Sequence, residues 1–581
     1  MLPGRADIAP RVQADYCYTF LAADRLYEGF GPTSTHPHAP FQEWEWFGDW
    51  TFLTQWPVGY PALLCVVRGV MRCGTVAAGQ SIAIVSIALA LVAWFAWALR
   101  VLPSGPASWL LAAVAACSAV SVEALINPAT DTVIVALVPV TLLLVQTAPD
   151  RKAGPSPGLL FCTGVLAGLL FWFRYAAIYV PAAVGLVLLT GRLRRRVGFR
   201  DVAAFAAGSL IPVVSLLVLN RACATAVPLQ EQLNLGTALR PDLDPTIFAT
   251  AWWNFTGLPF YNYLWFSRWV LAAGVPAGVV LLVLLRRDWR AAGWSLVRRS
   301  PYVLSAATAV VLLAMLISAT MLFRAKYDYA NLERYYTAAR PLYLLLFVGP
   351  LLALPSRSVR ALACVPLLLC LSWYVQVEWP RPYQRWLAAE RPRTDYGRWA
   401  RCFEPSSPAL YRWLREVDNP GLMVVSNHPD EIALETWVPA CPLPEDEAQL
   451  HRWAARMREA RGVDDLRILF VLDPSNHTRD YYLPAPERVM HDFRLVPFAA
   501  APESVRGYVF EYRLPNRLPS RYDTARAPTC PETAYEPGPL AERHRHRAPG
   551  RAGAAYHCPR QDHGGAEVPP VGQADHPLHG L

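Results

Sequence analysis

The feature that most constrains this chain is a succession of apolar runs, most of them close to the length that crosses a bilayer. We expect membrane spans at residues 77–99, 108–125, 130–147, 158–173, 177–189, 202–219, 268–285, 301–322, 338–354 and 361–377. Hydrophobic residues make up 54% of the 581 positions and charged residues 17%. That composition is too apolar for a soluble or a disordered chain of this size. The sequence therefore predicts an α-helical polytopic membrane protein.

The net charge of +9 does not indicate nucleic-acid binding. The arginines gather in short loops between apolar runs, where they act as orientation signals, and they do not form a basic face interleaved with aromatic residues. The twelve cysteines are mostly scattered singly, with no CxxC pair and no Cys/His spacing that suits zinc. Cys402 and Cys441 are the one pair that we consider for a disulfide, on condition that their domain lies outside the cell.

The distribution of arginine predicts the topology. If the chain enters its first span from outside, every loop placed inside is basic. These loops hold Arg100, then Arg151 and Lys152, then the run 192–200, then a run ending at Arg299, and finally Arg357 and Arg360. This alternation requires residues 57–70, which begin with WPVGYP, to form an interfacial helix and not a span. It leaves Arg68 and Arg72 outside, against the rule.

The outer side then collects polar residues at the ends of the predicted spans. They include Asp15, Asp24, His36, His38, Asn127, Asp131, Arg174, Tyr175, Asp328, Glu333, Arg334 and Tyr335. A charge near the end of a span can snorkel to the interface, so one such residue needs no function. Several of them on one side, together with acids, favour a polar site at that edge of the bilayer.

The chain changes character after residue 377. We expect a helix at 408–417, buried strands at 422–426 and 467–472, an amphipathic helix at 446–460 and a closing strand at 508–514. This pattern predicts a small α/β domain on the outer side. The remaining tail is rich in Pro, Gly, Arg and His and is expected to be disordered. The domains are therefore a first outer loop with interfacial helices (1–76), a multi-span domain (77–377), an extracytoplasmic α/β domain (378–514) and the tail (515–581).

Five motifs follow one another along the chain. They read ADYCYTFLAADRLYEGFG, TQWPVGYPALL, NPATDTVIVAL, GVLAGLLFWFRYAAIYVPAAVGLVLL and LERYYTAARPLYLLL. Taken in order, they resemble those of the GT-C class of polyprenyl-phosphate-sugar glycosyltransferases. Within that class the chain is most similar to the bacterial relatives of dolichyl-phosphate-mannose protein mannosyltransferases. The resemblance covers about residues 14–377. It implies a GT-C-like membrane enzyme of the plasma membrane of a bacterial type of cell, with an extracytoplasmic active site.

The resemblance also implies a role for Asp15, which occupies the place of the acid that such enzymes carry in the first outer loop. The family often has two neighbouring acids there, whereas Ala14 and Tyr16 flank Asp15 in this chain. A requirement for a divalent metal is therefore left open. The family normally begins with a span before this loop, and whether such a span lies upstream of Met1 is left open.

The chemistry of sugar transfer agrees with these positions. Asp15 would be the base for the incoming hydroxyl. Arg174 and Arg334 would hold the phosphate, and Tyr175 and Tyr335 would add hydroxyl donors or ring contacts. Each residue also has a structural alternative. Arg174 can pair with an acid, Arg334 can pair with Asp328 or Glu333, and Asp131, the weakest of the substrate-binding candidates, can cap a helix.

The function predicted from the sequence is transfer of a sugar from a polyprenyl-phosphate donor to an extracytoplasmic acceptor, and the class implies inversion at the anomeric carbon. The acceptor is a protein, a lipid or a glycan, and membrane lipids are the other partners. Two alternatives stay open. A multi-span transporter would share the spans, although no paired half-repeats are visible. A non-catalytic cell-envelope assembly protein could share the fold without using the acid.

Overall fold

The computed structural model describes residues 14–34, 50–53, 56–120, 130–147, 156–193, 197–223, 251–252, 255, 291, 295–296, 298–323, 336–354, 356–380, 407–444, 446–473 and 486–512. The chain divides into two compact units, Met1–Asp523 and Thr524–Leu581, and all the described residues belong to the first. The expected span at 268–285 and the expected tail at 515–581 lie outside the described residues.

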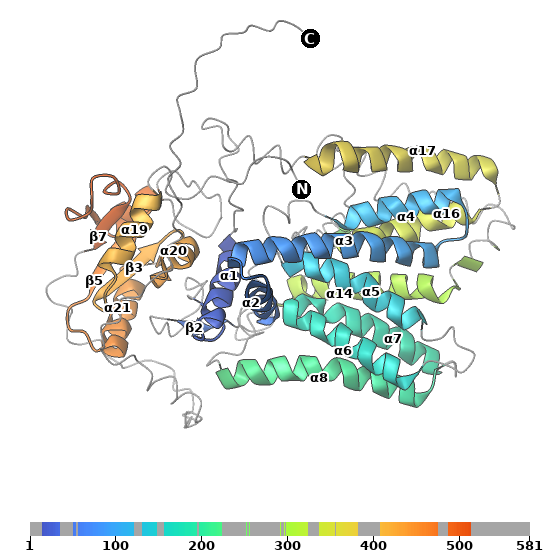
Figure 1. Cartoon of the computed structure of the whole chain (residues 1–581), viewed down its shortest axis with the longest axis horizontal. Coiled ribbons are helices and arrows are strands. Elements are labelled where there is room, and N and C mark those ends of the chain that lie inside the picture. Colours follow the sequence, from blue (N-terminus) through green and yellow to red (C-terminus); the bar gives the residue numbers. More distant parts are fainter. Residues whose placement is uncertain are drawn as a thin grey trace, which may run out of the picture. The chain divides into compact units, whose positions relative to one another are not determined.

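Apolar helices account for most of the described residues up to 380 (Figure 1). They are α2 (Gly59–Met71), α3 (Thr75–Val101), α4 (Pro106–Ala119), α5 (Thr130–Thr147), α6 (Pro157–Phe173), α7 (Tyr179–Leu193), α8 (Phe199–Cys223), α14 (Ser300–Phe323), α15 (Arg340–Tyr343), α16 (Gly349–Ala353) and α17 (Arg357–Trp373). A π-helical stretch, η5 (Leu344–Val348), joins α15 to α16, and another, η6 (Tyr374–Glu378), extends α17. The chain is a multi-pass membrane protein of mainly helical fold.

The lengths of these helices follow the predicted spans with differences at the ends. Four of the described helices are long and apolar enough to cross a bilayer: Thr75–Val101, Phe199–Cys223, Ser300–Ser318 and Arg357–Gln376. The predicted span at 177–189 begins with a 3₁₀ turn, η2 (Tyr175–Ile178), and its helix continues to Leu193. The helix expected at 57–70 is α2, which at 13 residues is short for a span.

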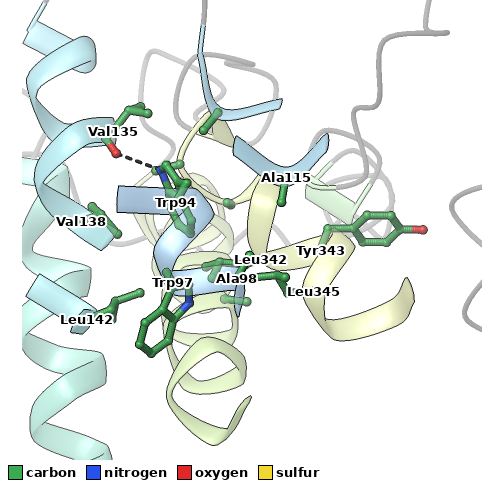
Figure 2. Close-up of a cluster of buried hydrophobic side chains, with 14 of the residues drawn as sticks. Trp94, Trp97, Ala98, Ala115, Val135, Val138, Leu142, Leu342, Tyr343 and Leu345 are labelled. Atoms are coloured by element: carbon green, nitrogen blue, oxygen red, sulfur yellow. Dashed lines mark hydrogen bonds between the residues drawn. The ribbon is translucent and has the colours of Figure 1, made fainter. Parts of the chain in front are cut away.

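The core of the bundle is built around two tryptophans of α3 (Figure 2). Trp94 and Trp97 are fully buried, and each indole N–H has an acceptor. Trp94 donates to the backbone oxygen of Val135 on α5 at 3.0 Å, and Trp97 donates to Ser305 Oγ on α14 at 3.1 Å. An unpaired indole N–H in such surroundings would be costly. These two hydrogen bonds therefore fix the position of α3 along its axis relative to α5 and α14.

Helices α6 and α8 pack closely because glycines leave room for the backbones to meet. A Cβ added at Gly164 would lie 2.3 Å from the backbone oxygen of Phe205, and one added at Gly168 would lie 2.3 Å from that of Ser209. In the other direction, a Cβ added at Gly208 would lie 2.2 Å from the backbone oxygen of Phe161. Small residues at such spacing are the usual means by which membrane helices come into contact.

The N-terminal segment before α2 is partly helical. Residues 14–27 form α1 (Ala14–Tyr27), which is followed by two short strands, β1 (Thr33–Ser34) and β2 (Thr51–Phe52), paired antiparallel. Asp15 was expected in the first outer loop. The structure places it in the first turn of α1.

The C-terminal region contains a five-stranded sheet with helices on both faces. Its strand order is β4-β3-β5-β7-β6, with β4 and β5 parallel to β3 and with β7 antiparallel to β5 and β6. The elements are α19 (Ser407–Val417), β3 (Leu422–Ser426), α20 (Pro429–Thr436), β4 (Ala440–Cys441), α21 (Glu447–Arg461), β5 (Arg467–Val471), α22 (Pro486–Asp492), β6 (Val496–Pro497) and β7 (Val509–Tyr512). The small α/β fold predicted for this region is confirmed.

Candidate active site

Asp131 and Arg174 form an ion pair at one end of the helical bundle. Asp131 lies in the first turn of α5, where a carboxylate is favoured by the helix dipole. Arg174 follows the last residue of α6 and has an extended backbone, at φ −159° and ψ 126°, before the chain turns into η2. The single extended residue directs the chain from α6 into α7. Both charged side chains are mostly buried: 15% of the Arg174 side chain and 19% of the Asp131 side chain are exposed.

A small pocket opens beside this pair. Its lining combines the two charged residues and Tyr179 with apolar residues of α5, the η2 turn, α14 and the turn before α15. The lining residues are Asp131, Ile134, Val135, Arg174, Ala176, Ala177, Tyr179, Leu312 and Ala338. Two opposite charges and a phenol in an otherwise apolar hollow can orient one polar group at the edge of an apolar molecule.

Tyr175 points to a different neighbour. Its side chain is buried, and its hydroxyl accepts a hydrogen bond of 3.0 Å from the Asn220 side-chain amide near the end of α8. Its ring meets Phe171 edge to face, with centroids 5.2 Å apart. Tyr175 is therefore adjacent to the ion pair in sequence but does not line the pocket, where Tyr179 stands instead. Asn220 and Tyr179 were not among the site residues predicted from the sequence.

Helices α1 and α2 lie next to the same end of α5 and α6. Phe20 of α1 and Tyr60 of α2 pack in one cluster with Val133, two residues after Asp131, and with Phe173, one residue before Arg174. The start of α2 touches α6 directly, because a Cβ at Gly59 would lie 2.4 Å from the backbone oxygen of Trp172. The structure thus brings α1, with Asp15 in its first turn, to the end of the bundle that carries the ion pair.

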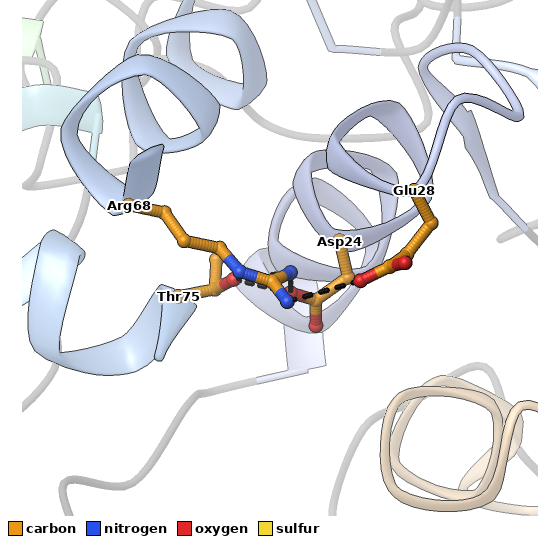
Figure 3. A network of polar contacts seen from close by, with 4 residues as sticks. All are labelled: Asp24, Glu28, Arg68 and Thr75. Atoms are coloured by element: carbon orange, nitrogen blue, oxygen red, sulfur yellow. Dashed lines mark hydrogen bonds and ion pairs between the residues drawn. The ribbon is translucent and has the colours of Figure 1, made fainter. Parts of the chain in front are cut away.

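A second polar network joins α1 to α2 and α3 (Figure 3). Arg68 of α2 donates to Asp24 Oδ1 at 2.6 Å and to Glu28 Oε1 at 3.2 Å, both on α1. Thr75, the first residue of α3, also donates to Asp24. Burial raises the pKa of the Asp24 carboxyl, while the bond from Thr75 and the charge of Arg68 oppose that effect. The two acids also compensate Arg68, which the topology prediction had left outside against the positive-inside rule.

The α/β domain contacts the N-terminal segment. Leu434 of α20 packs against the cluster that contains Phe20 and Tyr60. Trp437, the residue after α20, meets Phe30 edge to face with centroids 6.3 Å apart. The Arg25 guanidinium lies 3.7 Å from the ring centroid of Trp50 and 5.8 Å from that of Trp437.

The remaining candidates lie where the structure gives no description. Arg334 and Tyr335, together with their alternative partners Asp328 and Glu333, fall outside the described residues, as do His36 and His38. Of the two cysteines considered for a disulfide, Cys402 is outside them and Cys441 is fully buried on β4. Within the described residues, no group of three or more His, Cys, Asp or Glu side chains is placed to hold a metal ion.

Comparison with known proteins returned no matching family model and no matching curated sequence. The solved structures similar to this chain include an ArnT and archaeal oligosaccharyltransferases. One is ArnT from Cupriavidus metallidurans bound to undecaprenyl phosphate, at 12% identity and a TM-score of 0.49, covering 87% of this chain and 95% of that one.

Two others are oligosaccharyltransferase structures from Archaeoglobus fulgidus. The first, in complex with zinc and sulfate, has 12% identity and a TM-score of 0.39, and the match covers 79% of this chain and 64% of that one. The second, AglB with an inhibitory peptide and a dolichol-phosphate, has 10% identity and a TM-score of 0.42, with coverage of 80% and 66%. This chain therefore spans about two thirds of those chains.

Proposed function

We propose that this protein is an integral membrane glycosyltransferase that moves a sugar from a polyprenyl-phosphate donor to a protein, lipid or glycan acceptor on the extracytoplasmic side. The observation that carries the proposal is the Asp131–Arg174 pair beside a pocket at one end of the apolar helices. Helix α1 shares an apolar cluster with Val133 and Phe173, which neighbour the pair in sequence. A lipid-linked donor keeps its chain in the bilayer and its phosphate at the edge. A cation at the end of the helices suits such a donor.

Arg174 is the phosphate-binding residue in this proposal. A guanidinium presents several N–H donors in one plane, so it can serve a carboxylate and a phosphate oxygen through different N–H groups. Asp131 contributes to substrate binding indirectly, because its ion pair orients the Arg174 guanidinium. Arg334 is the second phosphate ligand, with Tyr335 beside it in sequence, and Tyr175 supports the site through its contact with Asn220.

Asp15 is the general base. The acceptor hydroxyl oxygen attacks the anomeric carbon of the sugar, and its proton passes to the Asp15 carboxylate. The bond between that carbon and the phosphate oxygen breaks, and the bonding electron pair leaves with the polyprenyl phosphate. Arg174 compensates the charge on the leaving phosphate. Attack from the side opposite to the leaving group inverts the anomeric configuration.

The test uses membranes that contain the full-length protein, a native acceptor extract and polyprenyl phosphates carrying a radiolabelled hexose or pentose, each tried separately. Asp15→Asn keeps the shape of the side chain but cannot accept the proton at neutral pH. Loss of a positioned general base lowers the rate on the order of 10² to 10⁴-fold. Abundance and membrane insertion should be unchanged, because the two side chains are nearly the same size.

Four outcomes separate the candidate functions. Loss of incorporation in Asp15→Asn supports the proposal. Incorporation at the wild-type rate would show that Asp15 is not the base. If wild type and variant both fail to incorporate any of the sugars, the non-catalytic assembly protein becomes the better description. Uptake of a labelled solute by wild-type proteoliposomes would instead favour the transporter.

A further inference from the structure

We infer that Asp24 is a positioning residue, whose carboxylate locks α1 onto α2 and α3 and thereby fixes the place of Asp15. This inference rests on the proposed function of Asp15. Asp24 and Asp15 share one helix, nine positions apart, which corresponds to about 13 Å along the axis. A contact that holds α1 at Asp24 therefore restrains the turn that begins with Ala14.

The contacts of Asp24 close a triangle across three helices (Figure 3). Arg68 donates from Nη1 to Asp24 Oδ1 at 2.6 Å and from the same nitrogen to Thr75 Oγ1 at 3.4 Å. The Thr75 hydroxyl donates in turn to the same Asp24 oxygen. Each group has the role that its chemistry allows: the cation only donates, the hydroxyl accepts and donates, and the carboxylate only accepts. The triangle is consistent with an ionised Asp24.

The burial of the network distinguishes it from a surface ion pair. The side chains of Arg68 and Asp24 are 20% and 22% exposed, and Thr75 is 5% exposed. Tyr27 of α1 covers the guanidinium, with 3.9 Å between the Arg68 Cζ atom and the ring centroid. Exposed pairs add little because water and side-chain freedom compete with them. A covered pair that is also bonded to a third helix restricts where α1 can lie.

Glu28 provides the internal comparison. It carries the same charge on the same helix and meets the same guanidinium, but at 3.2 Å and with 46% of its side chain exposed. If the network only balanced the charge of Arg68, the two acids would be interchangeable. If it positions α1, the buried acid bonded to two other helices matters and the exposed acid does not.

Asp24 could alternatively take part in chemistry, and a pair of substitutions separates the two roles. Arg68→Gln leaves a buried carboxylate without its cation, which is a costly arrangement. Asp24→Asn combined with Arg68→Gln replaces the ion pair by two amides that can bond to each other. A positioning role allows the double variant to recover activity that Arg68→Gln loses. A proton-transfer role for Asp24 does not, since the carboxylate is gone from the double variant.

The experiment measures sugar transfer and backbone hydrogen exchange on the full-length protein in native membranes or lipid nanodiscs. We expect Arg68→Gln to lower kcat at least 10-fold with the KM for the polyprenyl-phosphate sugar within about twofold, because the donor phosphate is held elsewhere. The kcat of the double variant should be at least fivefold higher than that of Arg68→Gln. Glu28→Gln should keep wild-type kcat. Exchange of the α1 amides should be faster in Arg68→Gln and return toward wild type in the double variant.

The exchange measurement keeps this inference separate from the proposed function. If wild type transfers no sugar but Arg68→Gln still accelerates exchange in α1 and the double variant reverses it, the clamp stands and the proposed function fails. If exchange and kcat are unchanged in Arg68→Gln, or if Glu28→Gln is as damaging as Arg68→Gln, the clamp is refuted. A double variant with the kcat of Arg68→Gln, despite restored α1 protection, would assign Asp24 a chemical role instead.

Discussion

Asp131 and Arg174 are 43 residues apart in the chain, yet their side chains form an ion pair where α5 begins and α6 ends. Neither charge is well solvated, so each one depends on the other. The pair therefore holds the guanidinium in one orientation before any substrate arrives. A binding group that is oriented in advance loses less freedom when the ligand binds.

Replacing Arg174 by lysine tests whether this orientation matters. Lys keeps the charge but is a point donor on a flexible stem, so it cannot hold a phosphate and a carboxylate through one plane. We expect Arg174→Lys to reduce kcat/KM for the polyprenyl-phosphate sugar about 10-fold or more, and to reduce protein abundance little. The measurement is the transfer assay across a range of donor concentrations.

Arg221→Lys is the matched control for this substitution. Arg221 lies in the last turn of α8, whose end is brought near α6 by the bond between Asn220 and Tyr175, and its side chain is exposed. The control should behave as wild type. Wild-type kcat/KM in Arg174→Lys would mean that Arg174 serves only as the structural partner of Asp131.

The interface between α6 and α8 predicts a strong dependence of stability on glycine. A Cβ at Gly168 would lie 2.3 Å from the backbone oxygen of Ser209 and 3.1 Å from Pro212 Cγ, so Gly168→Ala must separate the helices. Overpacking of this kind costs about 1–3 kcal/mol. We expect a lower midpoint of thermal unfolding in detergent.

Gly185→Ala is the control for helix propensity. Gly185 lies inside α7, and a Cβ added there would meet nothing within 4 Å. Alanine is better than glycine inside a helix by roughly 0.5–1 kcal/mol, so this variant should unfold at the wild-type temperature or above it. Equal destabilisation by the two substitutions would argue against the close helix contact.

The helices of the bundle could be predicted because each one corresponds to a continuous run of apolar residues in the sequence. The segment 14–27 has no such run: it mixes Asp15, Asp24 and Arg25 with alanines and aromatic residues. Its helix is stabilised by contacts with other elements, among them the burial of Phe20, Leu21 and Ala23. Helix stability that comes from tertiary packing leaves little trace in the intrinsic helix propensity of the residues.

The same limit applies to the site. Asp131 and Arg174 were recognisable because a charge beside an apolar run is expensive and needs a reason. The partners were not recognisable: Asp24 and Arg68 are separated by 44 residues, and Tyr175 and Asn220 by 45. In the α/β domain, β3 and β5 were predicted from their apolar residues, whereas β4 and β6 have two residues each and carry no pattern.

His428, a partly buried histidine of the α/β domain, predicts a dependence of stability on pH. Burial lowers the pKa of His428 to about 4, and the charge of Asp473 opposes this effect. The unfolded chain takes up the proton near pH 6.5, so between pH 6.5 and about 4 it binds more protons than the folded domain. The stability due to neutral His428 is fully present above pH 6.5. As the pH falls from 6.5 to about 4, the free energy of unfolding decreases by roughly 3 kcal/mol in total.

Hydrogen exchange of the β3 and β5 amides in the full-length protein, corrected for the intrinsic effect of pH, measures this loss. Protection should fall from pH 7 to pH 5 in the wild type. His428→Gln removes the titrating group, so its protection should change less over the same interval even if its absolute value is lower. Parallel pH dependence in the two proteins would mean that another group is responsible.

The orientation of the bundle gives the last prediction. The contact between Tyr175 and Asn220 places the ends of α6 and α8 on one side of the membrane, so the end of α7 and the start of α8 lie on the other. The sequence 192–200, which spans these two helix ends, is rich in arginine, so the positive-inside rule assigns that side to the cytoplasm. Fusions after Arg196 and Arg290 should then give active β-galactosidase and inactive alkaline phosphatase, and fusions after Asn234 and Asn427 the reverse. The Asn427 fusion is decisive. Leu434 of the α/β domain packs in the cluster that contains Phe20 of α1, and Trp437 lies against Arg25 of α1, so the α/β domain and α1 must share a side. A cytoplasmic Asn427 would place the α/β domain and α1 together on the inner face, and it would exclude transfer to an extracytoplasmic acceptor at Asp15.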